Sequence, residues 1–391
     1  MAGGEVLARD PDGAVVLVRG AVPGERVRID EPVRRRGARR AEVVEVVVAS
    51  TDRAVPPCPH VAEGCGGCDW QHIAVGAQPG HKVAVVVDAL RRLGGLDDAE
   101  VVAGPALPAA GGRTSVRAGV LDGRAGFRRE RSHDVVVPRS CLVAHPLVEE
   151  LLVEGRFGQA DEVTIRVGAR TGERLVLAQP GRAGVVVPDD VVVVGDDELT
   201  GGRRVWIHEE VGGRRFRISA RSFFQTRPDG AEALVAAVVA AAGDALGPGV
   251  RLVDAYAGVG LFSRLLLDAD GPGAGGSGVV VERSASSAAD ARANLADLDV
   301  RHVRVDVARW RASPADLVVA DPARSGLGAG AVRALAGAGA PVLVLVSCDA
   351  GALGRDARLL AEAGYDHAGS TVVDLFPHTH HVEVVSRFVR R

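Results

Sequence analysis

The chain has 391 residues, of which 47 % are hydrophobic, and a formal net charge of −3. This length allows two or three domains. It contains no apolar run near the roughly 18 residues that a membrane span needs, and its start, MAGGEVLARD, lacks a signal-peptide pattern. We therefore expect a cytoplasmic monomer without membrane contact, in which the five cysteines stay reduced.

Residues 1–52 are predicted to form a small β-barrel of the oligonucleotide-binding type. Turns with Gly or Pro-Gly separate short segments rich in β-branched residues, GAVVLVRG, RVRID and AEVVEVVVAS. The stretch between residues 26 and 40 carries seven arginines: Arg26, Arg28, Arg34, Arg35, Arg36, Arg39 and Arg40. This cluster suits RNA phosphates, and a solvated basic hairpin explains the charge alone equally well.

Residues 53–220 are predicted to form a β-rich central domain that carries four of the cysteines. Cys58, Cys65 and Cys68 lie close together, and Cys141 follows after a gap of 72 residues. Four soft thiolates suit an iron–sulfur cluster or a zinc ion. The spacing differs from the paired CxxC knuckles of a zinc ribbon but leaves zinc open as the alternative.

Residues 221–391 are predicted to form an α/β domain with a mainly parallel, doubly wound sheet. The helical segment PDGAEALVAAVVAAAGDAL is followed by short apolar strands that alternate with helices, from RLVDAYAG to VEVVSRFV. Continuously apolar strands of this kind are buried on both faces. The fold prediction is therefore a Rossmann-like sheet at the C-terminus.

A small-molecule site is expected at the carboxyl ends of these strands. The segment LVDAYAGVG places Asp254, Gly258 and Gly260 just after the first strand, where open α/β sheets bind cofactors. The dinucleotide fingerprint GxGxxG is incomplete, which argues against NAD. Acidic residues end the next strands, namely Glu282, Asp306 and Asp321. They fit S-adenosylmethionine, whose adenosine and cationic sulfonium carry no phosphate.

Two residues near the C-terminus suit covalent catalysis on a pyrimidine. Cys348 ends the apolar strand PVLVLVSC before a predicted helix, whose N-terminus would favour a thiolate. A thiolate added to C6 makes C5 nucleophilic towards a methyl donor, and a base then removes the C5 proton. Glu383, at the start of the last strand, is the predicted base. A buried structural cysteine is the alternative reading of Cys348.

The chain resembles the TrmA/RumA-type RNA uracil-5-methyltransferases over nearly its whole length. The resemblance rests on a TRAM-like N-terminus, the CPHVAEGCGGC cluster, SFFQT, DAYAGVG, VVVE, DPARSG, VSCDAGALGRD and DLFPHTHHVE. It implies Cys348 as nucleophile, Glu383 as base and a [4Fe–4S] centre on the four cysteines that aids RNA folding or binding. It also implies that the cofactor or target base contacts Gln225, Tyr256, Leu261, Glu282, Asp306 and Asp321.

The sequence departs from the family pattern at several positions. Thr226-Arg227 replaces a frequent Val-Asn, Asp349-Ala350 replaces Asn-Pro, and Leu261 replaces a polar residue, so that Leu261 offers only its backbone. Met1 begins where the first TRAM strand should already be complete. We therefore expect either a start codon further upstream or a barrel that lacks one strand.

The predicted function is methylation of C5 of a uridine in structured RNA, with 23S rRNA as the expected target. Uridine methylation in tRNA is the first alternative. A catalytically inactive RNA-binding or ribosome-assembly protein is an alternative of another class. Cytosine-5 methylation fits less well, because the chain has no Pro-Cys pair near the cofactor strands and no second site cysteine.

Overall fold

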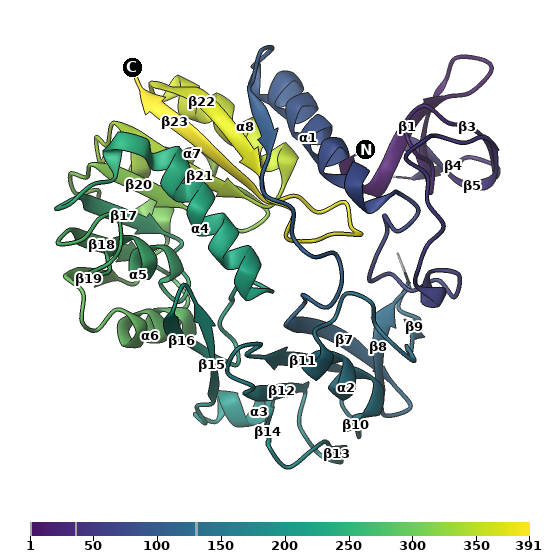
Figure 1. Cartoon of the computed structure of the whole chain (residues 1–391), viewed down its shortest axis with the longest axis horizontal. Coiled ribbons are helices and arrows are strands. Elements are labelled where there is room, and N and C mark those ends of the chain that lie inside the picture. The colour runs from purple at the N-terminus through teal and green to yellow at the C-terminus, as the bar shows by residue number, and fades with distance from the viewer. Residues whose placement is uncertain (1, 36, 130–131) are drawn as a thin grey trace.

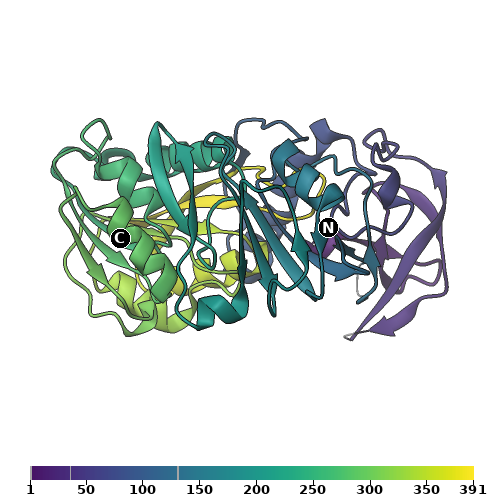
Figure 2. The same cartoon turned by 90° about the horizontal axis from the view of Figure 1, so that it is seen from below.

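The computed structural model describes residues 2–35, 37–129 and 132–391. Arg36 of the predicted basic cluster therefore lies outside the described residues. The molecule is flat and has three parts: the N-terminal strands and the large C-terminal sheet lie on opposite sides in Figure 1, and the central sheet lies below them both (Figures 1 and 2).

The N-terminal strands form a sheet of order β1-β2-β5-β3, with β4 paired to β5. Their bounds, after the 3₁₀ turn Ala2–Gly4, are β1 Glu5–Arg9, β2 Val15–Arg19, β3 Arg26–Ile29, β4 Val33–Arg35 and β5 Ala38–Val48. Val16, Val18 and Ala41 form its small buried core. A core of this size contributes little stability by itself, so the sheet depends on its contacts with the rest of the chain.

The central region is built on a mixed sheet of order β14-β12-β11-β7-β8-β9, while β10 pairs with β13. The strands are β7 Ser115–Leu121, β8 Arg124–Arg128, β9 Val135–Val136, β10 Arg156–Phe157, β11 Glu162–Val167, β12 Arg174–Gln179, β13 Val185–Val186 and β14 Val191–Gly195. The helices are α2 Pro146–Glu154 and α3 Asp196–Thr200, and 3₁₀ turns span Pro59–Val61 and Val75–Ala77. Helix α2 covers one face, where Val148, Leu151 and Leu152 are buried against Val163 and Ile165.

The large C-terminal sheet has the order β19-β18-β17-β20-β21-β23-β22-β6. Its strands are β6 Val101–Ala103, β17 Arg251–Ala255, β18 Ser277–Val281, β19 Val300–Val303, β20 Leu317–Ala320, β21 Val342–Ser347, β22 Tyr365–Val372 and β23 Val384–Arg390. Its helices are α1 Gln78–Ala89, α4 Pro228–Ala242, α5 Leu261–Leu267, α6 Ala285–Asn294, α7 Gly328–Ala336 and α8 Ala350–Glu362. A π turn at Leu90–Gly94 extends α1, and 3₁₀ turns span Gly243–Ala245 and Val307–Arg309.

The predicted doubly wound sheet is confirmed. Strands β17 to β21 run parallel to their neighbours, and β23 is antiparallel to both β21 and β22. Every residue of β20 and β21 is buried, as continuously apolar strands require. Helices α1, α7 and α8 cover one face, and α4 and α5 cover the other. Among the described helices, none has the length and apolar character that a bilayer crossing requires.

The structure differs from the predicted domain division in one segment. Residues 78–103 lie in the predicted central part of the sequence, but α1 packs on α8 and β6 pairs in parallel with β22 at the sheet edge. Helix α1 and the π turn that extends it end at Gly95, which adopts the left-handed conformation. The boundaries at residues 52 and 220 stay predictions.

A hairpin of β15 (Trp206–Val211) and β16 (Arg214–Ser219) joins the central region to the C-terminal sheet, with Asp290 of α6 as its main polar anchor. The Asp290 carboxylate is fully buried and accepts hydrogen bonds from Arg217 Nε (2.7 Å), Ser219 N (2.8 Å), Ser219 Oγ (2.8 Å) and Ser222 Oγ (2.6 Å). Removing a buried carboxylate that accepts this many hydrogen bonds strongly destabilises the fold, because its donors lose their acceptor.

We predict that Asp290→Ala lowers the free energy of unfolding by about 3 kcal/mol, because it removes the buried carboxylate that accepts hydrogen bonds from Arg217, Ser219 and Ser222. Urea denaturation measures the change. Asp297→Ala is the matched control, since this exposed aspartate pairs only with Arg264 in the described structure and should cost less than about 1 kcal/mol. Equal losses in the two variants would contradict the anchoring role.

Candidate active site

A cavity of about 720 Å³ opens at the carboxyl ends of the parallel strands. This is the edge at which open α/β sheets bind ligands. Nine of the ten residues predicted for catalysis or cofactor contact line it, namely Gln225, Tyr256, Gly258, Leu261, Glu282, Asp306, Asp321, Cys348 and Glu383. The tenth, Gly260, is not part of its wall. The predicted residues therefore come together although they span more than 150 positions of the sequence.

Glu282, just after β18, is held as a hydrogen-bond acceptor at one side of the cavity. Its carboxylate accepts hydrogen bonds from the backbone N–H of Gly258 (3.0 Å) and of Ser284 (2.6 Å). Gly258 has a φ of 57°, which lets the backbone turn towards this carboxylate without steric cost. Two oxygens fixed in this way remain able to accept further bonds from a ligand with neighbouring hydroxyl groups.

Gly260 and Asp254 serve the helix that follows β17 rather than the cavity. Gly260 has a φ of 91° and precedes α5, and a Cβ there would lie 2.9 Å from the Leu295 side chain. Asp254 accepts hydrogen bonds from Ser263 N (3.0 Å) and Ser263 Oγ (2.6 Å). Burial raises the pKa of Asp254 to about 6. Both residues shape the turn that carries the ligand-facing backbone.

Cys348 and Glu383 lie opposite each other at the end of an antiparallel strand pair. Ser347 of β21 is in register with Val384 of β23, so the next positions outward are Cys348 and Glu383. Cys348 is half-buried, and Glu383 is buried with 4 % of its surface exposed. Among the described residues, the Glu383 carboxylate has no hydrogen-bond or ion-pair partner in the protein. A buried acid without a partner faces the cavity ready to exchange a proton.

The acids around Cys348 raise one another's pKa values. Burial, followed by the charges of Glu383 and Asp321, raises the pKa of Cys348 to about 12, and Arg324 opposes this. Burial and the Asp254 charge raise the pKa of Asp321 to about 7. Burial, with the Asp321 charge, raises the pKa of Glu383 well above its ordinary value. In this state the thiol form of Cys348 is therefore favoured.

The helix predicted after Cys348 is confirmed, but its expected effect on the thiol is wrong. Helix α8 starts at Ala350, and the side chain of Asp349 accepts a hydrogen bond from Ala352 N (2.7 Å). This carboxylate caps the positive end of the helix itself. The net effect of the surroundings on the pKa of Cys348 is upward.

Two of the departures from the family pattern are structural. Thr226 O accepts hydrogen bonds from Thr114 N (2.7 Å) and Thr114 Oγ1 (2.8 Å). Arg227 is buried, bonds both oxygens of Asp229 at 2.7 Å, and donates to Pro108 O (2.9 Å). Neither residue lines the cavity. They attach the start of α4 to the central region.

Sequence reasoning missed Phe223, which lines the cavity with 63 % of its surface exposed. Its neighbour Phe224 is buried and packs on Phe216, with ring centroids 5.7 Å apart. The doubled aromatic in SFFQT was the available signal, because adjacent residues of an extended segment point to opposite sides and only one of them can enter the core.

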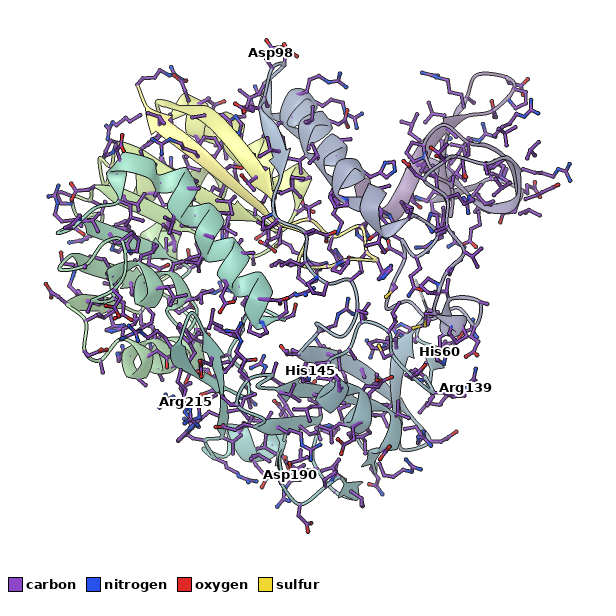
Figure 3. All side chains as sticks on the ribbon, in the orientation of Figure 1. His60, Asp98, Arg139, His145, Asp190 and Arg215 are labelled. Carbon is purple, nitrogen blue, oxygen red and sulfur yellow. The ribbon has the colours of Figure 1, made fainter. Side chains whose placement is uncertain are left out.

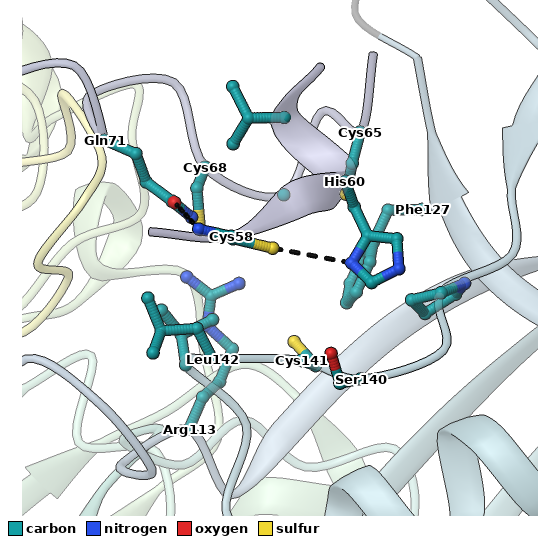
Figure 4. Close-up of a pocket in the computed structure, with 14 residues that line it drawn as sticks. Cys58, His60, Cys65, Cys68, Gln71, Arg113, Phe127, Ser140, Cys141 and Leu142 are labelled. Atoms are coloured by element: carbon teal, nitrogen blue, oxygen red, sulfur yellow. Dashed lines mark hydrogen bonds between the residues drawn. The ribbon is translucent and has the colours of Figure 1, made fainter. Parts of the chain in front are cut away.

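Cys58, Cys65, Cys68 and Cys141 line a second, small cavity of about 20 Å³ at the edge of the central sheet (Figures 3 and 4). Gln71 Oε1 accepts a hydrogen bond from Cys58 N (3.0 Å), and Arg113 also lines the wall. His60 accepts a hydrogen bond from Arg139 N (3.0 Å) and lies 3.5 Å from Cys58 Sγ. The described residues contain no group of three or more His, Cys, Asp or Glu side chains spaced to hold a metal ion.

Burial raises the pKa of the Cys65 thiol to about 11 and also raises the pKa values of Cys68 and Cys141. The Arg113 charge opposes the increase at Cys68 and Cys141. The four cysteines line one cavity and none of them is in a disulfide, and thiolates are the ligand type that soft metals prefer.

No family model matches the chain. An RNA methyltransferase of Streptomyces avermitilis is 38 % identical over 98 % of this chain and 95 % of that protein. The 23S rRNA (uracil(1939)-C(5))-methyltransferase RlmD of Chromohalobacter salexigens is 32 % identical, over 97 % of this chain and 86 % of that protein. The chain belongs to the RNA uracil-C5-methyltransferase family.

A solved structure extends this likeness to the whole fold of the methyltransferase. The tRNA (uracil-54, C5)-methyltransferase of Pyrococcus abyssi, in complex with S-adenosyl-L-homocysteine, covers 100 % of both chains with a TM-score of 0.73 and 22 % identity. The C-terminal sheet therefore has the class I methyltransferase fold.

We predict that Asp321→Asn stabilises the methyltransferase above pH 7 and not near pH 4. The folded state raises the pKa of Asp321 to about 7. The free energy of unfolding therefore falls as the pH rises from about 4 to about 7, because the carboxyl ionises more readily in the unfolded chain than in the folded one. Removing the charge should recover roughly 2 kcal/mol at pH 8, measured by urea denaturation at both pH values.

Asp316→Asn, at the other end of β20, is the control with the opposite sign. Arg251 lowers the pKa of Asp316, so this variant should lose a little stability at pH 8. If the free energy of unfolding of Asp321→Asn at pH 8 is equal to or lower than that of the wild-type protein, the ionised Asp321 carboxylate does not destabilise the fold.

Proposed function

We propose that the methyltransferase transfers a methyl group from S-adenosylmethionine to C5 of a uridine in structured RNA, with 23S rRNA as the target. The observation that carries this proposal is the opposition of the Cys348 thiol and the unpartnered Glu383 carboxyl across the β21–β23 pair, at the wall of one cavity. The C. salexigens relative is named for the same reaction on 23S rRNA.

The cavity divides into a cofactor side and a base side. Glu282, held by two backbone N–H groups, suits the ribose hydroxyls of the methyl donor, and Asp306 and Tyr256 lie beside it. Gly258 and the backbone of Leu261 complete this wall. Gln225, buried and without a side-chain partner among the described residues, is free to bond the uracil edge. Asp321 lies near both sides, beside Cys348.

The reaction on the uracil ring balances with these two residues. Cys348 releases its proton to water and its sulfur bonds to C6, which moves the electron pair of the C5–C6 double bond towards C5. C5 takes the methyl carbon as the donor's carbon–sulfur bond breaks, leaving S-adenosylhomocysteine. Glu383 removes the C5 proton, the C5–C6 double bond forms again, and the bond from C6 to Cys348 breaks. The thiolate that leaves at the end of the cycle regains a proton from water. Arg324 favours the ionised forms of both residues.

We predict that Cys348→Ala abolishes transfer of labelled methyl groups to RNA, whereas Glu383→Gln forms a covalent protein–RNA adduct that does not resolve. The adduct survives denaturing gel electrophoresis and carries the label, because the methyl group has moved but the C5 proton remains. Methyl transfer that persists in Cys348→Ala refutes the covalent mechanism. If the wild-type protein transfers no methyl group to any RNA, the alternative of a catalytically inactive RNA-binding protein is favoured.

The tRNA alternative has one specific observation in its favour. The full-length structural match is to a protein named for uridine methylation in tRNA. Mass spectrometry of 5-methyluridine in rRNA and tRNA, purified separately from a deletion strain with and without the restored gene, assigns the target. Loss confined to tRNA overturns the rRNA assignment.

We further propose that the N-terminal sheet is a TRAM-like barrel that binds RNA, with domain boundaries near residues 52 and 220. Arg34 and Arg35 of β4 are exposed, and Arg28 pairs with Glu45 at the surface. Exposed cations on a small sheet bind phosphates in a salt-dependent way. Residues 58–68, which carry three of the cysteines that line the four-cysteine cavity, follow this sheet closely in the chain, and we assign both to the RNA-handling half.

We propose that the four cysteines hold a [4Fe–4S] cluster, with zinc as the alternative. The cluster would supply a rigid cross-link between residues 58–68 and Cys141. The protein purified without oxygen should be brown, with about four iron and four sulfide per chain. Cys141→Ala should be colourless, while Cys348→Ala keeps the colour and serves as the control. A colourless wild-type protein with stoichiometric zinc refutes the iron–sulfur assignment.

A further inference from the structure

The loop that carries Glu383, residues 373–383 between β22 and β23, is anchored by a part of the chain some 300 positions away. Trp70 N donates a hydrogen bond to His378 O (2.9 Å), and His378 N donates to Gln78 Oε1 (2.7 Å). The buried Lys82 donates to Asp374 Oδ1 (2.6 Å) and to Phe376 O (2.9 Å). These partners follow Cys68 directly in the sequence.

Asp69 makes the contact nearest to the base. Its Oδ1 accepts a hydrogen bond from His380 N (3.1 Å), and its Oδ2 lies 2.6 Å from His380 Nδ1. One carboxylate therefore fixes both the backbone and the ring of a residue three positions before Glu383. Gly4 packs against this pair, because a Cβ on Gly4 would clash with Asp69 Oδ2.

The loop conformation needs these contacts. His378 has a φ of 64° although it carries a side chain, and its ring is buried with Nδ1 lacking a partner among the described residues. A residue with positive φ and an unpaired buried nitrogen costs free energy, on the order of 1–3 kcal/mol, and persists only where the surroundings enforce it. The segment of residues 69–82 supplies that enforcement.

The nucleophile is supported differently. Cys348 follows the fully buried strand β21, and Asp349 caps α8 immediately after it. None of the hydrogen bonds described for residues 69–82 reaches this segment. The sheet thus holds both reacting groups, because β21 pairs with β23, but only the loop before Glu383 also takes hydrogen bonds from residues 69–82.

We infer that Asp69 is a positioning residue for the removal of the C5 proton, linking the segment after Cys68 to Glu383. The inference rests on the proposed function. Loss of the Asp69–His380 bonds should let the Glu383 loop relax while leaving Cys348 in place. The consequence is selective: addition to C6 and methyl transfer proceed, but resolution of the adduct is slow.

The test is a single-turnover experiment with Asp69→Asn, RNA substrate and labelled methyl donor. Covalent adduct should form at the wild-type rate and resolve about 10- to 100-fold more slowly, with kcat reduced to match and KM for RNA unchanged. His380→Asn removes the ring bond to Asp69 Oδ2 but keeps the backbone bond to Oδ1, so it should slow resolution in the same direction and to a smaller extent. It also decides the matter if Asp69→Asn does not fold.

Asp52→Asn is the matched control, because Asp52 also pairs with a histidine, His81, at 3.0 Å but does not bond the loop. It should form and resolve the adduct at wild-type rates. A wild-type rate of resolution in both Asp69→Asn and His380→Asn, or an equal loss of adduct formation and resolution, overturns the positioning role. Absence of adduct and of 5-methyluridine with the wild-type protein refutes the proposed function instead.

Discussion

The enclosure of three ionisable groups in one cavity governs the chemistry available to this protein. Burial raises the pKa values of Cys348, Asp321 and Glu383, and the charge of each acid adds to the effect on its neighbours. The apolar packing on both faces of the sheet stabilises the strands that carry these groups and offsets the unfavourable burial of the groups. A general base works best when its pKa lies near the working pH, so the raised pKa of Glu383 suits it to take up the C5 proton in the proposed reaction.

Much of the catalytic sheet could be predicted from the sequence, because its strands are short apolar runs with no competing periodicity. Strands β17, β18, β20 and β21 and helix α4 appear where the pattern places them, whereas β19 ends at Val303, earlier than the expected end near Asp306. The contribution of residues 78–103 could not be predicted. Strand β6 has only three residues, and its partner β22 lies more than 260 positions later, so no local sequence pattern predicts that the two strands pair.

The site was predictable to the extent that parallel strands bring their carboxyl ends to one edge. That rule located Glu282, Asp306, Asp321 and Cys348 together. It could not distinguish Gly260, which serves the turn into α5, from Gly258, which bonds Glu282. It also gave no sign of Asp69, whose role depends on a contact with His380 across 311 positions of the chain.

Strand β6 also has a consequence for the synthesis of the protein. Strand β6 leaves the ribosome early, yet its neighbour β22 is among the last elements made. Lys82 likewise leaves the ribosome long before the loop of residues 373–383 to which it donates a hydrogen bond. Such contacts of high sequence separation form late and slowly. A nascent chain that ends before β22 therefore lacks both the partner of β6 and the loop that carries Glu383, so the proposed base becomes ordered only after these last elements have been made.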